Sequence, residues 1–505
     1  MREDSIKTGR VTKAATVVAA LFLSFLAASL IPDDTHADLP TRAYAQTPVS
    51  SVSPLQPATG SMITISLEEE ADLLLVDTDI WPVEFAAMNC EDFNGDGIAD
   101  MLVTSLGGMT PWHNRVDIVL GSRDLGGVLD ISTDSAVRIE GQFRIPGTNP
   151  PQYLTPRARA VGDFNGDSLT DVALDCCHGA FAVTTDSYAY IVYGGPAQLP
   201  LVLDLPTDAD VTIADLSKIN HIHLFGAGDI NGDGCEDLGV STEYWDRYCM
   251  TAVYLCTSML PEVIDVNEAQ AQVEKSFGEG HTKSYFISDI NGDGCDELVF
   301  TSDLSQIHDA YIWLGKPGLL VPATASATSA EIVVLPSMFG DPDVRASGDV
   351  NGDGIGDVTG TLGADTADGL LFKAHVWFGT PGYDSRVLES ANADATFLLD
   401  GMQYPVTKVL GDADGDGTKD VFIEVRYPSF FHQPDELYIF RGGPSLRGTH
   451  HLSEAVARIV GDRDIFCETA GDFNGDGYDD FVFRGRHPDS AYMVMFGPLL
   501  RPDYL

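Results

Sequence analysis

A nine-residue pattern of oxygen-bearing side chains occurs seven times in this sequence. In the first copy, residues 92–100 (DFNGDGIAD), positions 1, 3, 5 and 9 carry a carboxylate or an amide. The other copies begin at Asp163, Asp229, Asp289, Asp349, Asp412 and Asp472, so successive copies start 71, 66, 60, 60, 63 and 60 residues apart. Ca²⁺ prefers six to eight hard oxygen ligands in a flexible arrangement, which a short loop with acidic or amide groups at alternate positions can supply. The spacing therefore predicts up to seven calcium-binding loops.

Positions 1, 3, 5 and 9 are expected to bind Ca²⁺ through side-chain oxygens, and position 7 through its backbone carbonyl. The side chains at position 7 have nothing in common, which is expected where only the main-chain oxygen is used. The predicted metal ligands are Asp92, Asn94, Asp96, Ile98, Asp100, Asp163, Asn165, Asp167, Leu169, Asp171, Asp229, Asn231, Asp233, Cys235, Asp237, Asp289, Asn291, Asp293, Cys295, Glu297, Asp349, Asn351, Asp353, Ile355, Asp357, Asp412, Asp414, Asp416, Thr418, Asp420, Asp472, Asn474, Asp476, Tyr478 and Asp480.

Two positions of the pattern favour glycine. Position 4 is glycine in all seven copies and position 6 in six, which predicts backbone angles that a Cβ atom would penalise. The exception is Ser168, so the second loop is predicted to be the weakest site, by ~1 kcal/mol of strain. Position 9 of the fourth loop is Glu297, whose longer reach is expected to shift its ligation.

Other loops share the opening Asp-x-Asn-Gly-Asp-Gly. EF-hand and dockerin-type loops require an acidic residue at position 12, followed by a helix. Position 12 here is Val103, Leu174, Val240, Phe300, Gly360, Ile423 or Phe483, which excludes both. A tight turn in which Asp and Asn bind their own backbone without metal is the structural alternative, but no turn requires the acid at position 9. Magnesium is disfavoured because it demands stricter geometry.

Four extended segments surround each loop in the sequence. An apolar run such as 101–103 follows the loop, a second run such as 190–196 ends in a Gly/Pro turn, a more polar run such as 210–213 comes next, and residues such as 159–162 lead into the following loop. Four strands per period, repeated seven times without a long helical pattern, predict an all-β, seven-bladed β-propeller of four-stranded antiparallel blades. We name the strands A to D from the axis outward, with the acidic loop joining A to B. An open β-solenoid is disfavoured because its repeats are far shorter.

The ends of the repeat array predict how the ring closes. The chain finishes at the C strand of the last repeat, 492–498, with seven residues after it. An unpaired sheet edge invites aggregation, so we expect a strand at about residues 62–66 to supply the missing outer strand of the last blade.

The acidic loop, the strand after it and the Gly-x-Pro end of the C strand resemble the FG-GAP repeats, also called VCBS repeats. Such repeats occur in the N-terminal propeller of integrin α-chains and in many secreted bacterial proteins. The resemblance covers about residues 61–500. It implies a propeller with calcium in the loops, and related propellers serve in adhesion, as lectins and as parts of polysaccharide lyases. One departure is that every repeat keeps the acidic loop here, whereas integrin propellers keep it in only some.

The composition and the N-terminal residues constrain the partners and the location. A net charge of −47 disfavours nucleic acid and anionic membrane surfaces as partners and makes cations the natural ones. Basic residues followed by the uncharged run 14–31 predict a signal peptide over residues 1–45, cut after residue 37 or residue 45, with an uncleaved anchor as the alternative. Residues 46–60 read as a flexible linker before the propeller at 61–505. The expected location is secreted or cell-surface, without membrane insertion after cleavage.

Eight cysteines fit an oxidising compartment. Cys249 and Cys256 flank a predicted hairpin and could form a disulfide, and Cys90 and Cys467 precede the first and last loops. Reduced, buried thiols are the alternative for both pairs.

Residues for recognition are sought on the face opposite the acidic loops, where the B–C and D–A connections are expected to open. Clustered loop aromatics suit recognition of protein or sugar, although they could instead cap the ends of the blades. The candidate ligand-binding residues are Trp112, His113, Tyr153, Phe181, Tyr244, Trp245, Tyr427 and Phe431. His221 and His223 share one face of a predicted A strand, where a core or channel-lining role is favoured over metal binding.

Three function classes remain open from the sequence. The first is a calcium-binding, secreted binding or adhesion module for an extracellular protein or glycan. The second is a carbohydrate-active enzyme, either a polysaccharide lyase or a hydrolase, and the third is a structural scaffold. No Gly-x-Ser-x-Gly, phosphate-binding or His-Glu-x-x-His motif occurs, so no catalytic residue is assigned.

Overall fold

The computed structural model describes residues 62–500 with internal gaps. The gaps are 79–81, 108–114, 142–154, 178–187, 196–200, 206, 215–220, 245–247, 257–259, 270, 275–283, 302–309, 318–322, 327–331, 335–342, 346–347, 367–368, 383–386, 400–403, 428–434, 462–464 and 486–491. The predicted signal peptide and linker lie outside the described residues.

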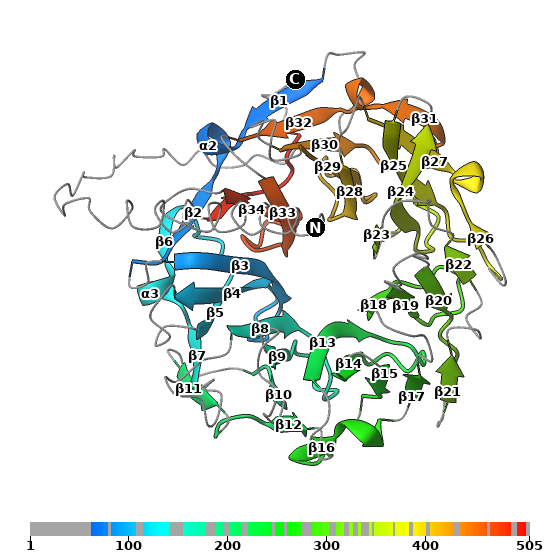
Figure 1. Cartoon of the computed structure of the whole chain (residues 1–505). Helices are drawn as coiled ribbons and strands as arrows, with labels where there is room; N and C mark the ends of the chain where they lie inside the picture. The colour runs from blue at the N-terminus through cyan, green and yellow to red at the C-terminus, as the bar shows by residue number, and fades with distance from the viewer. Residues whose placement is uncertain are drawn as a thin grey trace, which may run out of the picture. The chain divides into compact units, whose positions relative to one another are not determined.

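Seven small sheets form a ring, and the fold is a seven-bladed β-propeller (Figure 1), which confirms the predicted fold class. The A strands surround the axis, and each B strand pairs antiparallel with its A strand. Within the described part of the chain, no helix has the length and hydrophobicity that a membrane span needs.

Each of the first four blades runs from strand A at the axis to strand D further out. Blade 1 contains β3 (Pro82–Glu91), β4 (Asp100–Gly107), β5 (Arg115–Val119) and β7 (Val137–Gly141). Blade 2 contains β8 (Thr155–Ala160), β9 (Val172–Cys177), β10 (Tyr188–Val192) and β12 (Val211–Ala214). Blade 3 contains β13 (His221–Gly228), β14 (Asp237–Tyr244), β15 (Tyr248–Tyr254) and β17 (Ala271–Glu274). Blade 4 contains β18 (Ser284–Ile287), β19 (Glu297–Thr301), β20 (Ala310–Trp313) and β22 (Ile332–Val334).

The last three blades follow the same plan. Blade 5 contains β23 (Asp343–Arg345), β24 (Val358–Thr366), β25 (Gly369–Trp377) and β27 (Ala395–Leu398). Blade 6 contains β28 (Tyr404–Val409), β29 (Val421–Arg426), β30 (Glu436–Phe440) and β32 (Ala457–Val460). Blade 7 contains β33 (Ile465–Gly471), β34 (Asp480–Gly485), β35 (Tyr492–Met495) and β2 (Leu73–Val76).

Each sheet has a fifth strand beyond the four predicted antiparallel ones. It pairs parallel to strand D and comes from the C–D segment of the next repeat. From blade 1 to blade 7 the fifth strands are β11 (Leu201–Leu205), β16 (Val263–Asp265), β21 (Ala323–Ser326), β26 (Val387–Leu388), β31 (Gly448–His451), β1 (Ile63–Ser66) and β6 (Gly127–Asp130). Short helical turns follow five of them: α2 (Leu67–Glu70), α3 (Ile131–Asp134), η1 (Val266–Glu268), η3 (Ser390–Asn392) and η5 (Leu452–Glu454).

The N-terminal segment closes the ring as predicted, but with a different strand. β2 supplies strand D of blade 7, whereas residues 63–66 form β1, the fifth strand of blade 6. The physical reason is the strand exchange between repeats. The C–D segment of every repeat first pairs with the preceding blade and then returns as strand D, so the N-terminal segment performs both tasks. The sequence indicated that the outer edge of blade 7 had to be covered. It did not indicate that the N-terminal segment also covers the outer edge of blade 6.

Asp72 and Asp77 hold the closing strand at its two ends. The Asp72 backbone N–H donates to the Val494 carbonyl at 2.9 Å, and its carboxylate accepts from the Phe496 backbone N–H at 2.9 Å. Asp77 pairs with the buried Arg115 of blade 1, with Nη2 and Oδ2 2.7 Å apart. The closing strand is thus linked to both the last blade and the first.

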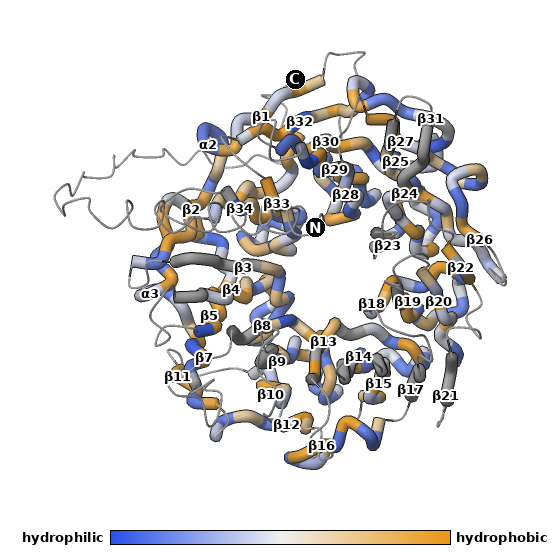
Figure 2. Tube along the Cα trace, viewed as in Figure 1, coloured by the Kyte–Doolittle hydropathy of each residue, from blue (hydrophilic) through white to orange (hydrophobic). Residues whose placement is uncertain are grey.

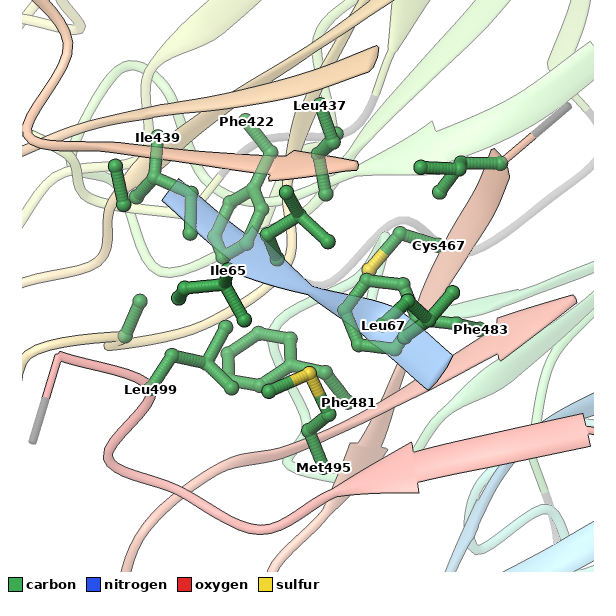
Figure 3. Close-up of a cluster of buried hydrophobic side chains, with 14 of the residues drawn as sticks. Ile65, Leu67, Phe422, Leu437, Ile439, Cys467, Phe481, Phe483, Met495 and Leu499 are labelled. Atoms are coloured by element: carbon green, nitrogen blue, oxygen red, sulfur yellow. The ribbon is translucent and has the colours of Figure 1, made fainter. Parts of the chain in front are cut away.

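The hydrophobic core lies between neighbouring blades, and hydrophobic stretches occur along the strands of every blade (Figure 2). Figure 3 shows the cluster at the boundary between blades 6 and 7. There Ile65 and Leu67 of the N-terminal segment pack among Phe422, Phe481 and other apolar residues. Burial of apolar area of this kind is the main favourable term that holds adjacent blades together.

Candidate metal-binding loops

All seven acidic loops join an A strand to a B strand, as predicted. In blade 1, for example, β3 ends at Glu91 and β4 begins at Asp100. Neighbouring loops contact each other through main-chain hydrogen bonds, such as Thr170 N to Asp92 O at 3.1 Å and Gly356 N to Asp289 O at 2.7 Å. The acidic loops therefore lie on one face of the ring.

The aspartate at position 1 organises the first half of each loop. Asp92 Oδ1 accepts from the backbone N–H groups of Gly95 and Asp96 at 2.6 and 3.1 Å, and Oδ2 accepts from Gly97 N at 2.8 Å. The same bonds to positions 4, 5 and 6 recur in loops two to six, and the bonds to positions 5 and 6 recur in loop seven. Local bonds from Asp to the backbone compete with regular strand pairing, so this residue fixes the turn.

The aspartate at position 5 has a second, smaller role. Asp96 Oδ1 accepts from the Ile98 backbone N–H at 2.9 Å. The equivalent bond is present in every loop. It holds the backbone at position 7, and the carbonyl of this residue is a predicted metal ligand.

The acid at position 9 is buried in every loop and fastens the loop to its blade. Asp357, for example, is fully buried, and its Oδ2 accepts from Val350 N at 2.8 Å. Its Oδ1 accepts from Gly379 N, at the end of strand C, at 2.9 Å. One carboxylate therefore links the start of the loop, the start of strand B and the end of strand C.

Burial raises the pKa of the position-9 acid in all seven loops. The pKa of Asp357 rises to about 7 because desolvation and the nearby Asp349 and Asp353 outweigh the stabilising backbone hydrogen bonds. Burial raises the pKa of Glu297 further, to about 9, and its Oε2 atom is buried without a hydrogen bond in the described structure. Each loop thus gathers carboxyl groups at a place where solvent does not stabilise their ionised form.

This donor set fits calcium. Each loop offers hard oxygen atoms from carboxylates, an amide or fourth carboxylate, and a backbone carbonyl, which are the ligands that Ca²⁺ prefers. In the sixth loop one carboxylate oxygen from each of Asp412, Asp414 and Asp420 lies within 4.8 Å of the others. A divalent cation would neutralise this buried negative charge, so the residues present can hold the ion.

The backbone angles agree with the glycine pattern. Position 4 has φ between +69° and +81°, and Ser168 at position 6 has φ +70°, in the left-handed region where a side chain is penalised. The strain predicted for the second loop is therefore present in its backbone. A Cβ added at the other position-6 residues would meet no atom within 4 Å, so the cost at Ser168 is conformational rather than steric crowding.

The side chains at position 7 have a role that the sequence did not indicate. Each covers the position-4 glycine of the preceding loop, so that a Cβ on Gly95 would lie 2.9 Å from Leu169 and one on Gly415 would lie 2.8 Å from Tyr478. The interpretation that these side chains are unconstrained was incomplete, because the contact crosses a blade boundary and the partner is a glycine. No single-repeat pattern could have revealed it.

A second contact joins each loop to the next blade. The N–H group after the end of strand C donates to the carbonyl at position 2 of the preceding loop, as in Gly195 N to Phe93 O at 2.9 Å and Thr380 N to Ile290 O at 3.0 Å. Five of the seven boundaries have this bond among the described residues, and at the boundary between blades 6 and 7 Leu500 N donates to Ala413 O instead, at 3.2 Å. Ordering of one loop therefore orders the boundary beside it.

One disulfide is present in the described structure, and it differs from the pair considered from the sequence. Cys256 bonds to Cys235, with Cα atoms 5.9 Å apart, and not to Cys249. Cys235 is position 7 of the third loop, and Cys256 stands at the end of strand C, where the other six blades have glycine. The fold brings these two sites together in every blade, which the hairpin argument could not show. Cys90 and Cys467 are buried, free thiols.

The candidate recognition residues are only partly described. Trp112, His113, Tyr153, Phe181, Trp245 and Phe431 lie outside the described residues. Tyr244 ends β14 and His221 and His223 lie in β13, but the structure does not describe their side chains. Tyr427 is half-buried against the core between blades 5 and 6, and its hydroxyl lies 3.2 Å from Glu436 Oε2. This one tyrosine therefore packs as a cap of the blade.

No protein-family model matches the chain, and no curated protein is significantly similar to it in sequence. Among solved structures, it is similar to the exotype rhamnogalacturonan lyase YesX, at 11% identity and a TM-score of 0.34, over 82% of this chain and 73% of that one. The rhamnogalacturonan lyase YesW gives 11% identity and a TM-score of 0.36 with the same coverage. The hemagglutinin-neuraminidase ectodomain of parainfluenza virus 5 gives 8% identity and a TM-score of 0.30, over 86% of this chain and 92% of that one. At these values the similarities carry no argument about activity.

Proposed function

We propose that this protein is an exported, calcium-stabilised β-propeller that acts as a binding or adhesion module for an extracellular protein or glycan. The observation that supports the metal is the buried acid at position 9, which occurs in all seven loops. It accepts from the backbone N–H at position 2 in the first six loops and at position 3 in the seventh. The backbone bonds of this acid do not require a second and a third carboxylate beside it, whereas a bound cation does.

Calcium would be held by the side chains at positions 1, 3, 5 and 9 and by the carbonyl at position 7. It would supply positive charge to a cluster whose carboxylates are partly desolvated. Because every loop also contacts the next blade, the chain's own hydrogen bonds would pass this stabilisation to the blade boundaries. Calcium is thus proposed as a component of the scaffold, and not as a catalyst.

Recognition is proposed for the face opposite the loops, where the B–C connections carry the candidate aromatics. This proposal rests on the sequence of those connections, in which the repeats differ most. Tyr427 is excluded from the proposed recognition set because of its contact with Glu436 and the core.

The calcium proposal is tested by metal analysis and calorimetry of the purified protein. Bound calcium is expected in the metal analysis, and excess EGTA should lower the melting temperature while added Ca²⁺ restores it. Each site that binds only the folded state stabilises it by about 2.7 kcal/mol at a free Ca²⁺ concentration 100 times Kd. Magnesium at the same concentration is the control. A protein without bound calcium, with the same melting curve in EGTA and in calcium, would contradict the proposal.

The recognition proposal is tested with a polysaccharide and glycan array that is read for both binding and product release. Binding without release is expected, and it should be lost in Trp112→Ala or Trp245→Ala but kept in Tyr427→Phe. Product release would instead favour the carbohydrate-active enzyme. Absence of both would exclude a glycan ligand and leave an extracellular protein ligand or the structural scaffold.

A further inference from the structure

The sixth loop differs from the other six at position 3. It has Asp414 where the others have asparagine. Arg441 Nε lies 2.6 Å from Asp414 Oδ2, and the side chains are 25% and 8% exposed. The extra carboxylate is therefore paired with a cation.

Arg441, like Asp414, differs from the residues at the same place in the other six blades. It directly follows strand C, just before Gly442, whose backbone N–H donates to Asp420 Oδ1 at 2.8 Å. The residues at this place in the other blades are uncharged: Leu120, Tyr193, Leu255, Leu314, Phe378 and Phe496. The one loop with an additional acid is thus the one blade with an arginine beside it.

The pair reproduces the net charge of an asparagine. In the second, third and fifth loops the asparagine amide donates to the position-9 carboxylate, as in Asn165 Nδ2 to Asp171 and Asn351 Nδ2 to Asp357, both at 3.2 Å. In the sixth loop position 3 has no amide donor, and the positive charge of Arg441 cancels the charge of Asp414. The ligand positions together with Arg441 then carry a formal charge of −3, as the ligand positions of the other loops do.

We propose that Arg441 is a built-in counter-cation that lowers the calcium affinity of the sixth loop and stabilises that loop when no metal is bound. The proposal rests on the proposed calcium function of the loops. Ligand charge count is a main determinant of calcium affinity in short loops. Without Arg441 the loop would present four uncompensated carboxylates, bind calcium more tightly and repel itself more strongly when empty.

Tyr478, at position 7 of the seventh loop, provides a reporter at the boundary between the sixth and seventh loops. A change that depends on residue 414 or 441 is assigned to the sixth loop, because these variants leave the seventh loop unaltered. Its ring lies over Gly415, such that a Cβ there would be 2.8 Å from Tyr478 Cε1. Labelling with 3-fluorotyrosine, and assignment of the Tyr478 signal by its loss in Tyr478→Phe, would allow calcium titration by ¹⁹F NMR. Every variant in the comparison carries the same label.

The test compares Arg441→Leu, which introduces the residue found in blades 1, 3 and 4, with the double variant Asp414→Asn/Arg441→Leu. Arg441→Leu is expected to lower the apparent Kd at the reporter roughly fivefold to tenfold, by removing one positive charge near the ion. The double variant should return to about the wild-type value because its charge is again that of the other loops. Arg447→Leu, which removes an exposed arginine paired with Asp394 outside the loop, controls for net charge and should leave Kd unchanged.

Stability in EGTA gives an independent measurement. Arg441→Leu should melt below Arg447→Leu when no calcium is bound, and the double variant should recover the difference. If the wild-type protein binds calcium and Arg441→Leu has the same Kd, the proposed role of Arg441 is overturned and the proposed function is not. A wild-type protein that binds no calcium would overturn this inference and the proposed function together.

Discussion

The ring of acidic loops and the outer rim of fifth strands are built from the same seven repeats, yet they differ in how strictly the repeats agree. The loops keep the same aspartate-centred hydrogen bonds in every blade. The fifth strands vary in length from two to five residues and have no common sequence. All the exposed large hydrophobic side chains of the described chain lie in fifth strands: Val128, Leu201, Val202, Val263 and Val387.

The difference reflects what each region requires of its side chains. In a loop, almost every polar atom has an assigned partner, so a changed side chain leaves buried groups unsatisfied. A fifth strand needs only main-chain pairing to strand D, and either a polar or an apolar residue can point outward. Substitutions should therefore be costly at the loops and cheap at the rim.

Substitutions in the closing segment should give the largest effect. This segment contains a rim strand, β1, followed in the chain by a core strand, β2. Leu75 in β2 is fully buried, whereas Thr64 in β1 is exposed. Leu75→Asp would bury a charge in the last blade and should cost about 4 kcal/mol or more, giving aggregated or unfolded protein. Thr64→Asp should leave a monomeric protein with nearly the same melting temperature. Size-exclusion chromatography and calorimetry would distinguish them, and a soluble, equally stable Leu75→Asp protein would contradict closure by β2.

Within one loop, the buried acid should matter more than the exposed one. Asp357→Ala leaves the N–H groups of Val350 and Gly379 without their acceptor, and should lower the free energy of unfolding by about 2–4 kcal/mol. Asp353→Ala removes a single bond from Ile355 N at an exposed site, and should cost about 1 kcal/mol. Urea denaturation in EGTA measures both effects without any contribution from metal. Equal costs would show that position 9 acts only through an ion.

The second loop offers a substitution that should increase the stability of the protein. Ser168→Gly removes a side chain from a residue with φ +70° and should stabilise the protein by about 1 kcal/mol. The reverse change in the first loop, Gly97→Ser at φ +82°, should destabilise it by a similar amount. Calorimetry of the pair in EGTA is the measurement. A destabilised Ser168→Gly variant would mean that the serine hydroxyl makes a contribution larger than the strain.

The rim should give the smallest effect. Val202 is 62% exposed in the fifth strand β11, so Val202→Thr should change the free energy of unfolding by less than about 0.5 kcal/mol. The same change at Val211, which is buried in β12, the next strand along the chain, should cost about 1–2 kcal/mol. Denaturation of the two variants would show whether the rim tolerates change. A costly Val202→Thr would indicate that the rim is packed against a second copy.

Much of this structure could be predicted because it depends on local chemistry repeated seven times. The loop residues, their glycines and the strands around them follow from turn geometry and alternation, so the blade number and the strain at Ser168 were accessible. Contacts between repeats were not accessible. The packing of Leu169 on Gly95, the Cys235–Cys256 disulfide and the pairing of Asp414 with Arg441 depend on which ends the fold brings together.

The fifth strands were missed for a related reason. A short segment of mixed composition between strands C and D gives no periodic signal, and its parallel pairing uses main-chain groups that any sequence provides. Val263–Asp265 and Val387–Leu388 are too short to be recognised as strands. For the same reason the closing segment was assigned to one blade, although it serves two.

Because strands are exchanged between blades, one repeat of the sequence does not correspond to one blade. A stretch such as 127–192 begins with β6 on blade 7, continues with β7 as strand D of blade 1, and ends with β8, β9 and β10 inside blade 2. Duplication or loss of one such unit would alter three blades at once, yet every new junction would meet the same complementary edges. A propeller built in this way can change its blade number by duplication or deletion of whole sequence repeats. A deletion that followed the edges of one blade would instead leave a strand of another repeat without its sheet.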